Sequence, residues 1–129
     1  MDRVIADTDV LIDFVEGTGA WAQVDGLLSR GRLATTAVNV FELWRGCDDE
    51  DERSSLRRAL RGVAVYPVND AAARRAAEVD RELARRGAGI GERDTLVAGV
   101  ALATRLSVLT GNVEHFRRVA GLRVVKARR

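Results

Sequence analysis

Short apolar runs alternate along the chain with longer segments in which apolar residues recur at helical spacing. The first run, RVIAD, has consecutive apolar residues, as is typical of a strand that is buried on both faces. Together the runs predict five short strands, at residues 3–7, 32–37, 63–68, 107–111 and 122–127.

The segments between these runs have the period of an amphipathic helix. Trp21, Val24, Leu27 and Leu28 show the spacing clearly. Helices are predicted at residues 8–17, 19–31, 38–46, 48–62, 70–87, 92–106 and 112–121, with a glycine-rich loop at 87–91. Strands that alternate with helices predict an α/β fold, in which a parallel sheet is covered by helices on both faces. No repeat or linker divides the chain, so we expect one domain over residues 1–129.

Composition agrees with a globular protein that builds one core. The chain has 129 residues, of which 47% are hydrophobic and 31% charged. Its longest apolar stretch, residues 95–104, is about half the length of a membrane span. With no signal-peptide pattern and a single cysteine, Cys47, we expect a cytoplasmic protein and no membrane partner.

Charge is separated along the chain although the net charge is only +2. Acids dominate residues 48–52, whereas bases gather at 57–61, 74–75, 85–86 and 117–129. Nearly all bases are arginine, which suits bidentate phosphate contacts but also fits the codon bias of a GC-rich genome. The sequence leaves both explanations open.

Three acids occupy positions where an acid is costly. Asp7 ends the first apolar run, and Glu42 lies inside the helical stretch AVNVFELW. Asp94 lies on the same helix face as the apolar residues Val97, Ala98 and Ala101. No lysine or arginine is spaced to neutralise each of them, so we expect one shared divalent cation, Mg²⁺ or Mn²⁺. Ligands bind beyond the carboxyl ends of parallel strands, where Asp7, Thr110 and Asn112 are also expected.

Each acid also has a purely structural interpretation. Asp7 caps the next helix in that interpretation, Glu42 pairs with Arg45, and Asp94 is a first-turn acid that the helix dipole favours. The three interpretations are less convincing together than singly, because all three acids have apolar flanks.

Four motifs in order resemble the PIN-domain family, and most closely its VapC toxins. These are IADTDVLIDFVEG, TTAVNVFELWRG, IGERDTLVAGVALA and VLTGNVEHF, which span essentially the whole chain. The resemblance implies a three-layer α/β/α fold with a short central parallel sheet. It also implies a metal-dependent endoribonuclease that leaves a 5′-phosphate and a 3′-hydroxyl. Asp7, Glu42 and Asp94 would be both the catalytic residues and the Mg²⁺ or Mn²⁺ ligands.

The last motif departs from the family, which often has a fourth acid where this chain has Asn112. Asn112 either binds near the metal or caps the following helix, and Glu114 is an alternative source of the fourth carboxylate. Thr8 and Thr110 would hold the ligands or phosphate through their hydroxyls, or serve as cap or turn residues. Asp9 matches a variable family position and would support the ligands without binding the metal itself. His115 is expected to be an ordinary helix residue rather than a base.

Partners and rivals follow from the same resemblance. Similar toxins form homodimers, bind RNA as substrate and are silenced by a small antitoxin of the VapB type. The main rival is a non-catalytic RNA-binding or interaction module on the same fold. A phospho-accepting receiver domain would need an aspartate after a central strand and a partnering lysine, which the chain does not offer. A nuclease that acts on single-stranded DNA is the remaining alternative.

Overall fold

A five-stranded parallel sheet forms the centre of the computed structural model, which describes residues 2–129. The strands are β1 (Val4–Ala6), β2 (Leu33–Thr36), β3 (Ala64–Tyr66), β4 (Ser107–Thr110) and β5 (Val124–Lys126). They lie side by side in the order β3-β2-β1-β4-β5, and every neighbouring pair is parallel.

The strand order places a topological switch point between β1 and β4. From β1 the chain builds outward through β2 to β3, and it then returns to the other side of β1 for β4 and β5. In open parallel sheets a crevice forms where the connections diverge in this way, outside the carboxyl ends of the strands. The residues that follow Ala6 and Thr110 therefore face one another across that crevice.

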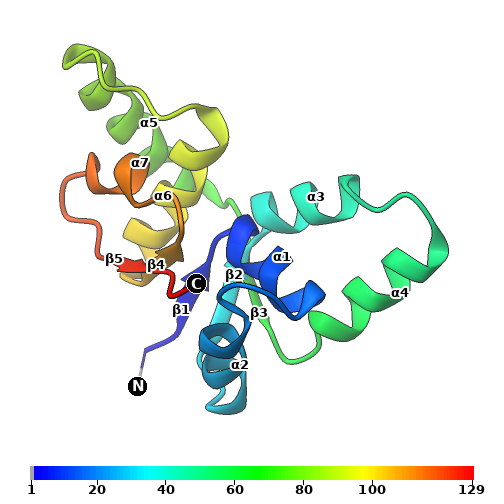
Figure 1. Cartoon of the computed structure of the whole chain (residues 1–129). Coiled ribbons are helices and arrows are strands. Elements are labelled where there is room, and N and C mark those ends of the chain that lie inside the picture. Colours follow the sequence, from blue (N-terminus) through cyan, green and yellow to red (C-terminus); the bar gives the residue numbers. More distant parts are fainter. Residues whose placement is uncertain (1) are drawn as a thin grey trace.

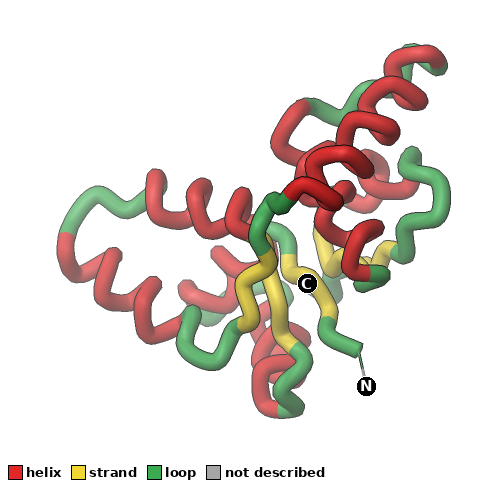
Figure 2. The backbone as a smooth tube through the Cα atoms, turned by 180° about the vertical axis from the view of Figure 1, so that it is seen from behind, coloured by secondary structure: helices red, strands yellow, loops and turns green. Residues whose placement is uncertain are grey.

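Helices cover both faces of the sheet, as Figures 1 and 2 show from opposite sides. One layer holds α1 (Thr8–Glu16), α2 (Trp21–Ser29), α3 (Ala37–Arg45) and α4 (Glu50–Ala59). The other holds α5 (Asp70–Arg85), α6 (Glu92–Thr104) and α7 (Val113–Arg117). The α/β fold with helices on both faces is thus confirmed.

The consecutive apolar residues of β1 explain how one strand serves two cores. Ile5 is fully buried against the α5, α6 and α7 layer. Its neighbours Val4 and Ala6 point the opposite way and pack with the α1 and α2 layer. Because successive side chains alternate across a strand, a strand buried on both faces needs apolar residues at every position.

Most elements are a few residues shorter than predicted, and the C-terminal end is one example. The helix predicted at 112–121 ends at Arg117, because Val119 and Leu122 donate to carbonyl groups three residues earlier and the backbone turns at Gly121, where φ is +80°. The strand predicted at 122–127 is reduced to Val124–Lys126. Within residues 2–129, no helix is both long and apolar enough to span a bilayer.

Helices α5 and α6 pack closely at Gly99. A Cβ atom at this position would lie 2.5 Å from the carbonyl oxygen of Ala72 and 2.7 Å from the Cβ of Ala76. We expect Gly99→Ala to lower the free energy of unfolding by about 1–3 kcal/mol, because backbone atoms cannot withdraw from the added methyl group. Urea unfolding measures this.

Gly89→Ala is the matched control for that measurement, since a Cβ at Gly89 meets nothing within 4 Å. It should leave stability unchanged or raise it slightly. Equal effects of the two substitutions would contradict the close approach of α5 and α6.

Candidate functional site

The carboxyl group of Asp7 lies at the switch point, immediately after β1, and is almost entirely buried, with 8% of the residue exposed. Its Oδ1 accepts hydrogen bonds from the backbone N–H of Thr8 (2.9 Å) and from Nδ2 of Asn39 (3.1 Å). Its Oδ2 accepts one from the hydroxyl of Thr110 (2.8 Å). Asp7 does cap α1, as its structural interpretation predicts, but two further donors from other elements converge on it.

Burial raises the pKa of Asp7 from 3.8 to about 6. The hydrogen bonds from Thr110 and Thr8 act in the opposite direction, whereas the negative charges of Asp9 and Asp94 raise the pKa further. All three donors to Asp7 are neutral groups. The carboxylate is therefore solvated by dipoles but has no paired cation, and it experiences two other acids.

Asn39 connects Asp7 to the other side of the site, and the sequence analysis missed it. The side chain is fully buried, and its Oδ1 accepts from the hydroxyl of Thr36 (2.7 Å) in a capping box at the start of α3. Its Nδ2 donates to Asp7 and also to the hydroxyl of Thr8 (3.0 Å). The spacing Thr-x-x-Asn at a strand-to-helix boundary was the available signal in the sequence.

Glu42 lies at the next step of this network. The hydroxyl of Thr8 donates to its Oε1 (2.8 Å), and Nη1 of Arg93 donates to its Oε2 (2.8 Å). The structural interpretation that pairs Glu42 with Arg45 does not hold, since the Arg45 guanidinium stacks on Phe41 instead. The expectation that no base neutralises these acids is also wrong for Glu42, because α6 brings Arg93 across the site.

Asp94 is held from the opposite side of the crevice by His115. Nδ1 of His115 lies 2.9 Å from Oδ2 of Asp94. An ionised carboxylate only accepts hydrogen bonds, so Nδ1 carries the proton and donates it. His115 lies on helix α7, as the sequence predicts, but its contact with Asp94 was not predicted.

Asn112 belongs to the same cluster. It lies at the N-cap position of α7 but makes no side-chain capping bond, so that part of its structural interpretation is wrong. Its amide lies 3.0 Å from the same Nδ1 of His115. Glu114 is exposed on α7, and Asn112 rather than Glu114 contacts His115.

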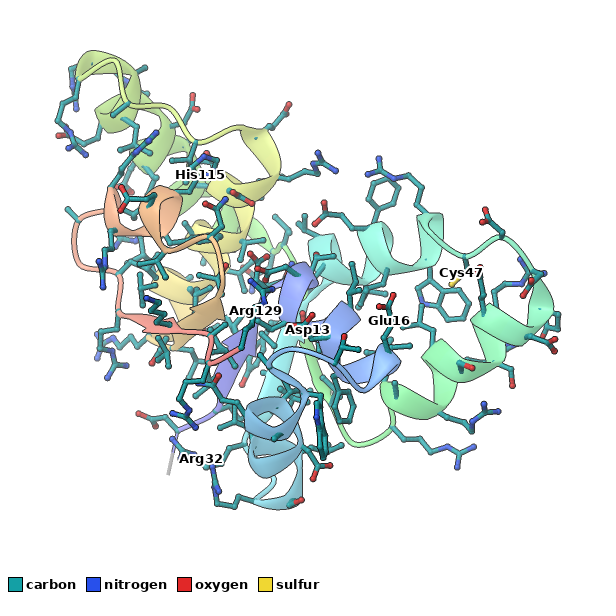
Figure 3. The ribbon with its side chains drawn as sticks, in the orientation of Figure 1. Asp13, Glu16, Arg32, Cys47, His115 and Arg129 are labelled. Atoms are coloured by element: carbon teal, nitrogen blue, oxygen red, sulfur yellow. The ribbon has the colours of Figure 1, made fainter. Side chains whose placement is uncertain are left out.

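Asp9 occupies the rim of the site together with the last residue of the chain. Its Oδ2 accepts from the N–H of Gly111 (2.9 Å) and from Nη2 of Arg129 (3.1 Å). The Nε of Arg129 also donates to Asp13 (2.9 Å), and Figure 3 shows these two side chains together. Asp13 additionally accepts from the N–H of Ala20, as expected of a structural residue.

Two chains of hydrogen bonds thus lead from Asp7 to the other predicted site residues. One runs through Asn39 and Thr8 to Glu42, and the other begins at Thr110, whose hydroxyl accepts from the N–H of Asn112 (2.9 Å). Among residues 2–129, no three histidine, cysteine, aspartate or glutamate side chains are already grouped in a geometry that holds a metal ion. Glu42 and Asp94 are instead directed toward Arg93 and His115.

Comparison with known proteins gives a family match over most of the chain. A family model described as PIN domain matches residues 4–122. The chain is 28% identical over 127 residues to the tRNA(fMet)-specific endonuclease VapC of Shigella flexneri, covering 95% of this chain and 96% of that protein. It is 31% identical over 112 residues to ribonuclease VapC5 of Mycobacterium tuberculosis, covering 82% and 80% respectively.

Solved structures share the fold. DNA-bound VapBC from Salmonella typhimurium superposes with a TM-score of 0.87 at 23% identity, over 98% of each chain. VapBC2 from Rickettsia felis, bound to a promoter fragment, gives a TM-score of 0.84 at 18% identity, over 96% of this chain and 98% of that one. These likenesses confirm the predicted three-layer architecture.

The raised pKa of Asp7 makes stability depend on pH. Between about pH 4 and pH 6 the folded chain keeps a proton on Asp7 that the unfolded chain has released. The folded state then binds more protons, so its stability falls as pH rises through this window, by about 3 kcal/mol, and is flat above it. The quantity to measure is the unfolding free energy of the metal-free wild type minus that of Asp7→Asn.

That difference isolates Asp7, because other acids titrate alike in both proteins. It should decline from pH 4 to pH 6 in urea unfolding experiments. A difference that stays constant across this range would show that Asp7 titrates normally in the folded chain.

Proposed function

The chain belongs to the PIN-domain family, and on that premise we propose that it is a metal-dependent endoribonuclease toxin inhibited by a small cognate antitoxin. The observation that carries the proposal is Asp7, a buried carboxyl group with a raised pKa at the switch point, solvated by neutral donors and flanked by other acids. We propose further that residues 1–129 act as one domain, as a homodimer in the cytoplasm.

The donor set fits a hard divalent cation. Asp7, Asp9, Glu42 and Asp94 carry more negative charge than the two arginines that reach them, Arg93 and Arg129, offset. Only oxygen ligands are offered by these acids, and oxygen is what Mg²⁺ and Mn²⁺ prefer. Asp7, Glu42 and Asp94 would hold the ion after Glu42 and Asp94 turn from their present partners.

The side chains around the acids have distinct tasks. Asn39, Thr8 and Thr110 fix the direction of the carboxylates, since each donates a hydrogen bond to one of them. When bound, the cation supplies a nucleophilic water at neutral pH and offsets negative charge on the phosphate. Hydrolysis would form a bond from the water oxygen to phosphorus and break the bond from phosphorus to O3′. The water would lose one proton and O3′ would gain one, which leaves a 5′-phosphate and a 3′-hydroxyl.

The names of the curated relatives support RNA as substrate, since two are tRNA(fMet)-specific endonucleases and one is a ribonuclease. The solved VapBC complexes support a toxin–antitoxin pairing. One observation favours the rival, a non-catalytic module: Asn112 stands where the resemblance puts a fourth acid. An activity assay separates the two.

A groove between α1, α3 and α4 fits the antitoxin partner. It has a volume of about 440 Å³, and its apolar lining includes Ile12, Val15, Leu43 and Leu56. Its acidic lining is formed by Glu16, Glu42, Asp51 and Glu52. An amphipathic segment with basic residues would complement both parts. Because Glu42 lines this groove, such a segment reaches the metal site directly.

The nuclease proposal predicts RNA cleavage that needs Mg²⁺ or Mn²⁺ and leaves 5′-phosphate ends. Asp7→Asn, Glu42→Gln and Asp94→Asn should each reduce the rate more than about 100-fold, since even residues that only orient metal ligands contribute about 10-fold to 100-fold. The metal should also raise the melting temperature of the wild type.

Glu78→Gln is the control for these variants. Glu78 pairs with Arg75 on α5, with its side chain 67% exposed, so the same chemical change there should leave cleavage intact. Equal, negligible cleavage by wild type and all variants would favour the non-catalytic module.

The groove predicts how the antitoxin binds. Ile12 is 42% exposed in the groove, and Ile12→Glu adds a charge to its apolar lining. We expect at least a 10-fold loss of antitoxin affinity with no change in the metal-induced melting shift, because a buried unpaired charge costs more than about 1.4 kcal/mol. Calorimetric titration with the purified antitoxin measures the affinity.

Val65→Glu provides the comparison, because Val65 is 49% exposed on β3 and does not line the groove. Undiminished binding by Ile12→Glu would place the partner on another surface.

A further inference from the structure

Arg93 crosses the site to an acid on another helix. It directly precedes Asp94 on α6, yet its Nη1 donates to Oε2 of Glu42 on α3, 2.8 Å away. The Arg93 side chain is 55% exposed, whereas that of Glu42 is 20% exposed. The ion pair therefore lies where the site opens to solvent, and such pairs are weak because water competes for both partners.

The two oxygens of Glu42 already have partners. Oε1 accepts from the hydroxyl of Thr8 at 2.8 Å, and Thr8 is itself held by the buried Asn39. Oε2 is the oxygen that Arg93 occupies. A divalent cation that binds Glu42 through Oε2 competes with the guanidinium for that oxygen, since two positive groups repel at this distance.

Arg129, the other arginine at the site, is held quite differently. It bonds two carboxylates through separate nitrogens, Nη2 to Asp9 and Nε to Asp13. The Asp13 side chain is 16% exposed and is fixed in turn by the N–H of Ala20. Figure 3 shows Arg129 beside Asp13 at the C-terminal end of the chain. Arg129 is thus a fixed counter-ion, whereas Arg93 makes a single bond to one carboxylate.

We propose, resting on the proposed function, that Arg93 is an RNA-binding residue whose guanidinium is stored on Glu42 until a divalent cation takes that carboxylate. Once displaced, the guanidinium remains at the solvent-facing edge of the site, tethered to the first turn of α6. A phosphodiester of the RNA then replaces the carboxylate as its anionic partner. Planar guanidinium groups can bind phosphate through two parallel hydrogen bonds, as they also can a carboxylate.

The first measurement is Mn²⁺ affinity by calorimetry, in the absence of RNA. Arg93→Gln should bind Mn²⁺ about 3-fold to 10-fold more tightly than the wild type, because the cation no longer competes with a guanidinium. Arg74→Gln is the matched control. It removes an arginine from another exposed ion pair, with Asp70 on α5, and should bind Mn²⁺ like the wild type.

The second measurement is RNA affinity by fluorescence anisotropy, with Ca²⁺ in place of Mn²⁺ and the RNA checked by gel for integrity. Arg93→Gln should bind RNA about 10-fold more weakly than the wild type. The slope of its log affinity against log salt concentration should be shallower by about 0.7. Arg93→Lys keeps the charge but not the paired donors, so its RNA affinity should fall between those of the wild type and Arg93→Gln. Arg74→Gln should match the wild type.

The proposal requires both effects in the same variant. Unchanged Mn²⁺ affinity in Arg93→Gln overturns the storage on Glu42, and unchanged RNA affinity overturns the role in binding phosphate; either result rejects the proposal. If the wild-type chain itself does not bind Mn²⁺, the metal centre of the proposed function fails as well, which is a distinct result.

Discussion

Burial of the Asp7 carboxyl group is the constraint around which the site is arranged. A carboxylate that is only 8% exposed needs donors, and the chain supplies them from three elements: the start of α1, the first turn of α3 and the end of β4. These donors are dipoles without net charge, so they satisfy the oxygens without removing the cost of burying the charge. The raised pKa of Asp7 expresses the remaining cost. In the proposed function, a divalent cation would remove it.

The surrounding fold keeps the other acids at fixed distances from Asp7. Glu42 extends from α3, which begins with a capping box that the buried Asn39 completes. Asp94 and Arg93 lie on the first turn of α6, and α6 packs against α5 so closely that Gly99 has no room for a Cβ atom. The acids therefore sit on rigid elements, while their present partners, Arg93 and His115, are partly exposed and free to exchange.

The sequence predicted the architecture better than the contacts within the site. Consecutive apolar residues in strands such as Val4–Ala6 and helical periodicity elsewhere are local signals, and they gave the order of elements. The pairing of Glu42 with Arg93 joins residues 51 positions apart, and that of Asp94 with His115 joins residues 21 apart. Such contacts depend on how α3, α6 and α7 converge. Local spacing instead offered Arg45 as a structural partner of Glu42 and helix capping as one role of Asn112. Arg45 stacks on Phe41, and Asn112 occupies the N-cap position without a side-chain capping bond.

The hydrogen-bond network around Asp7 has a consequence for the order in which the site is completed during synthesis. Asp7 leaves the ribosome early, but the hydroxyl of Thr110 that completes its environment is made 103 residues later. Strand β1 lies between β2 and β4, so the middle of the sheet cannot close until almost the whole chain has emerged. The environment of Asp7 is therefore among the last parts of the fold to be completed, although Asp7 itself is among the first residues to be made.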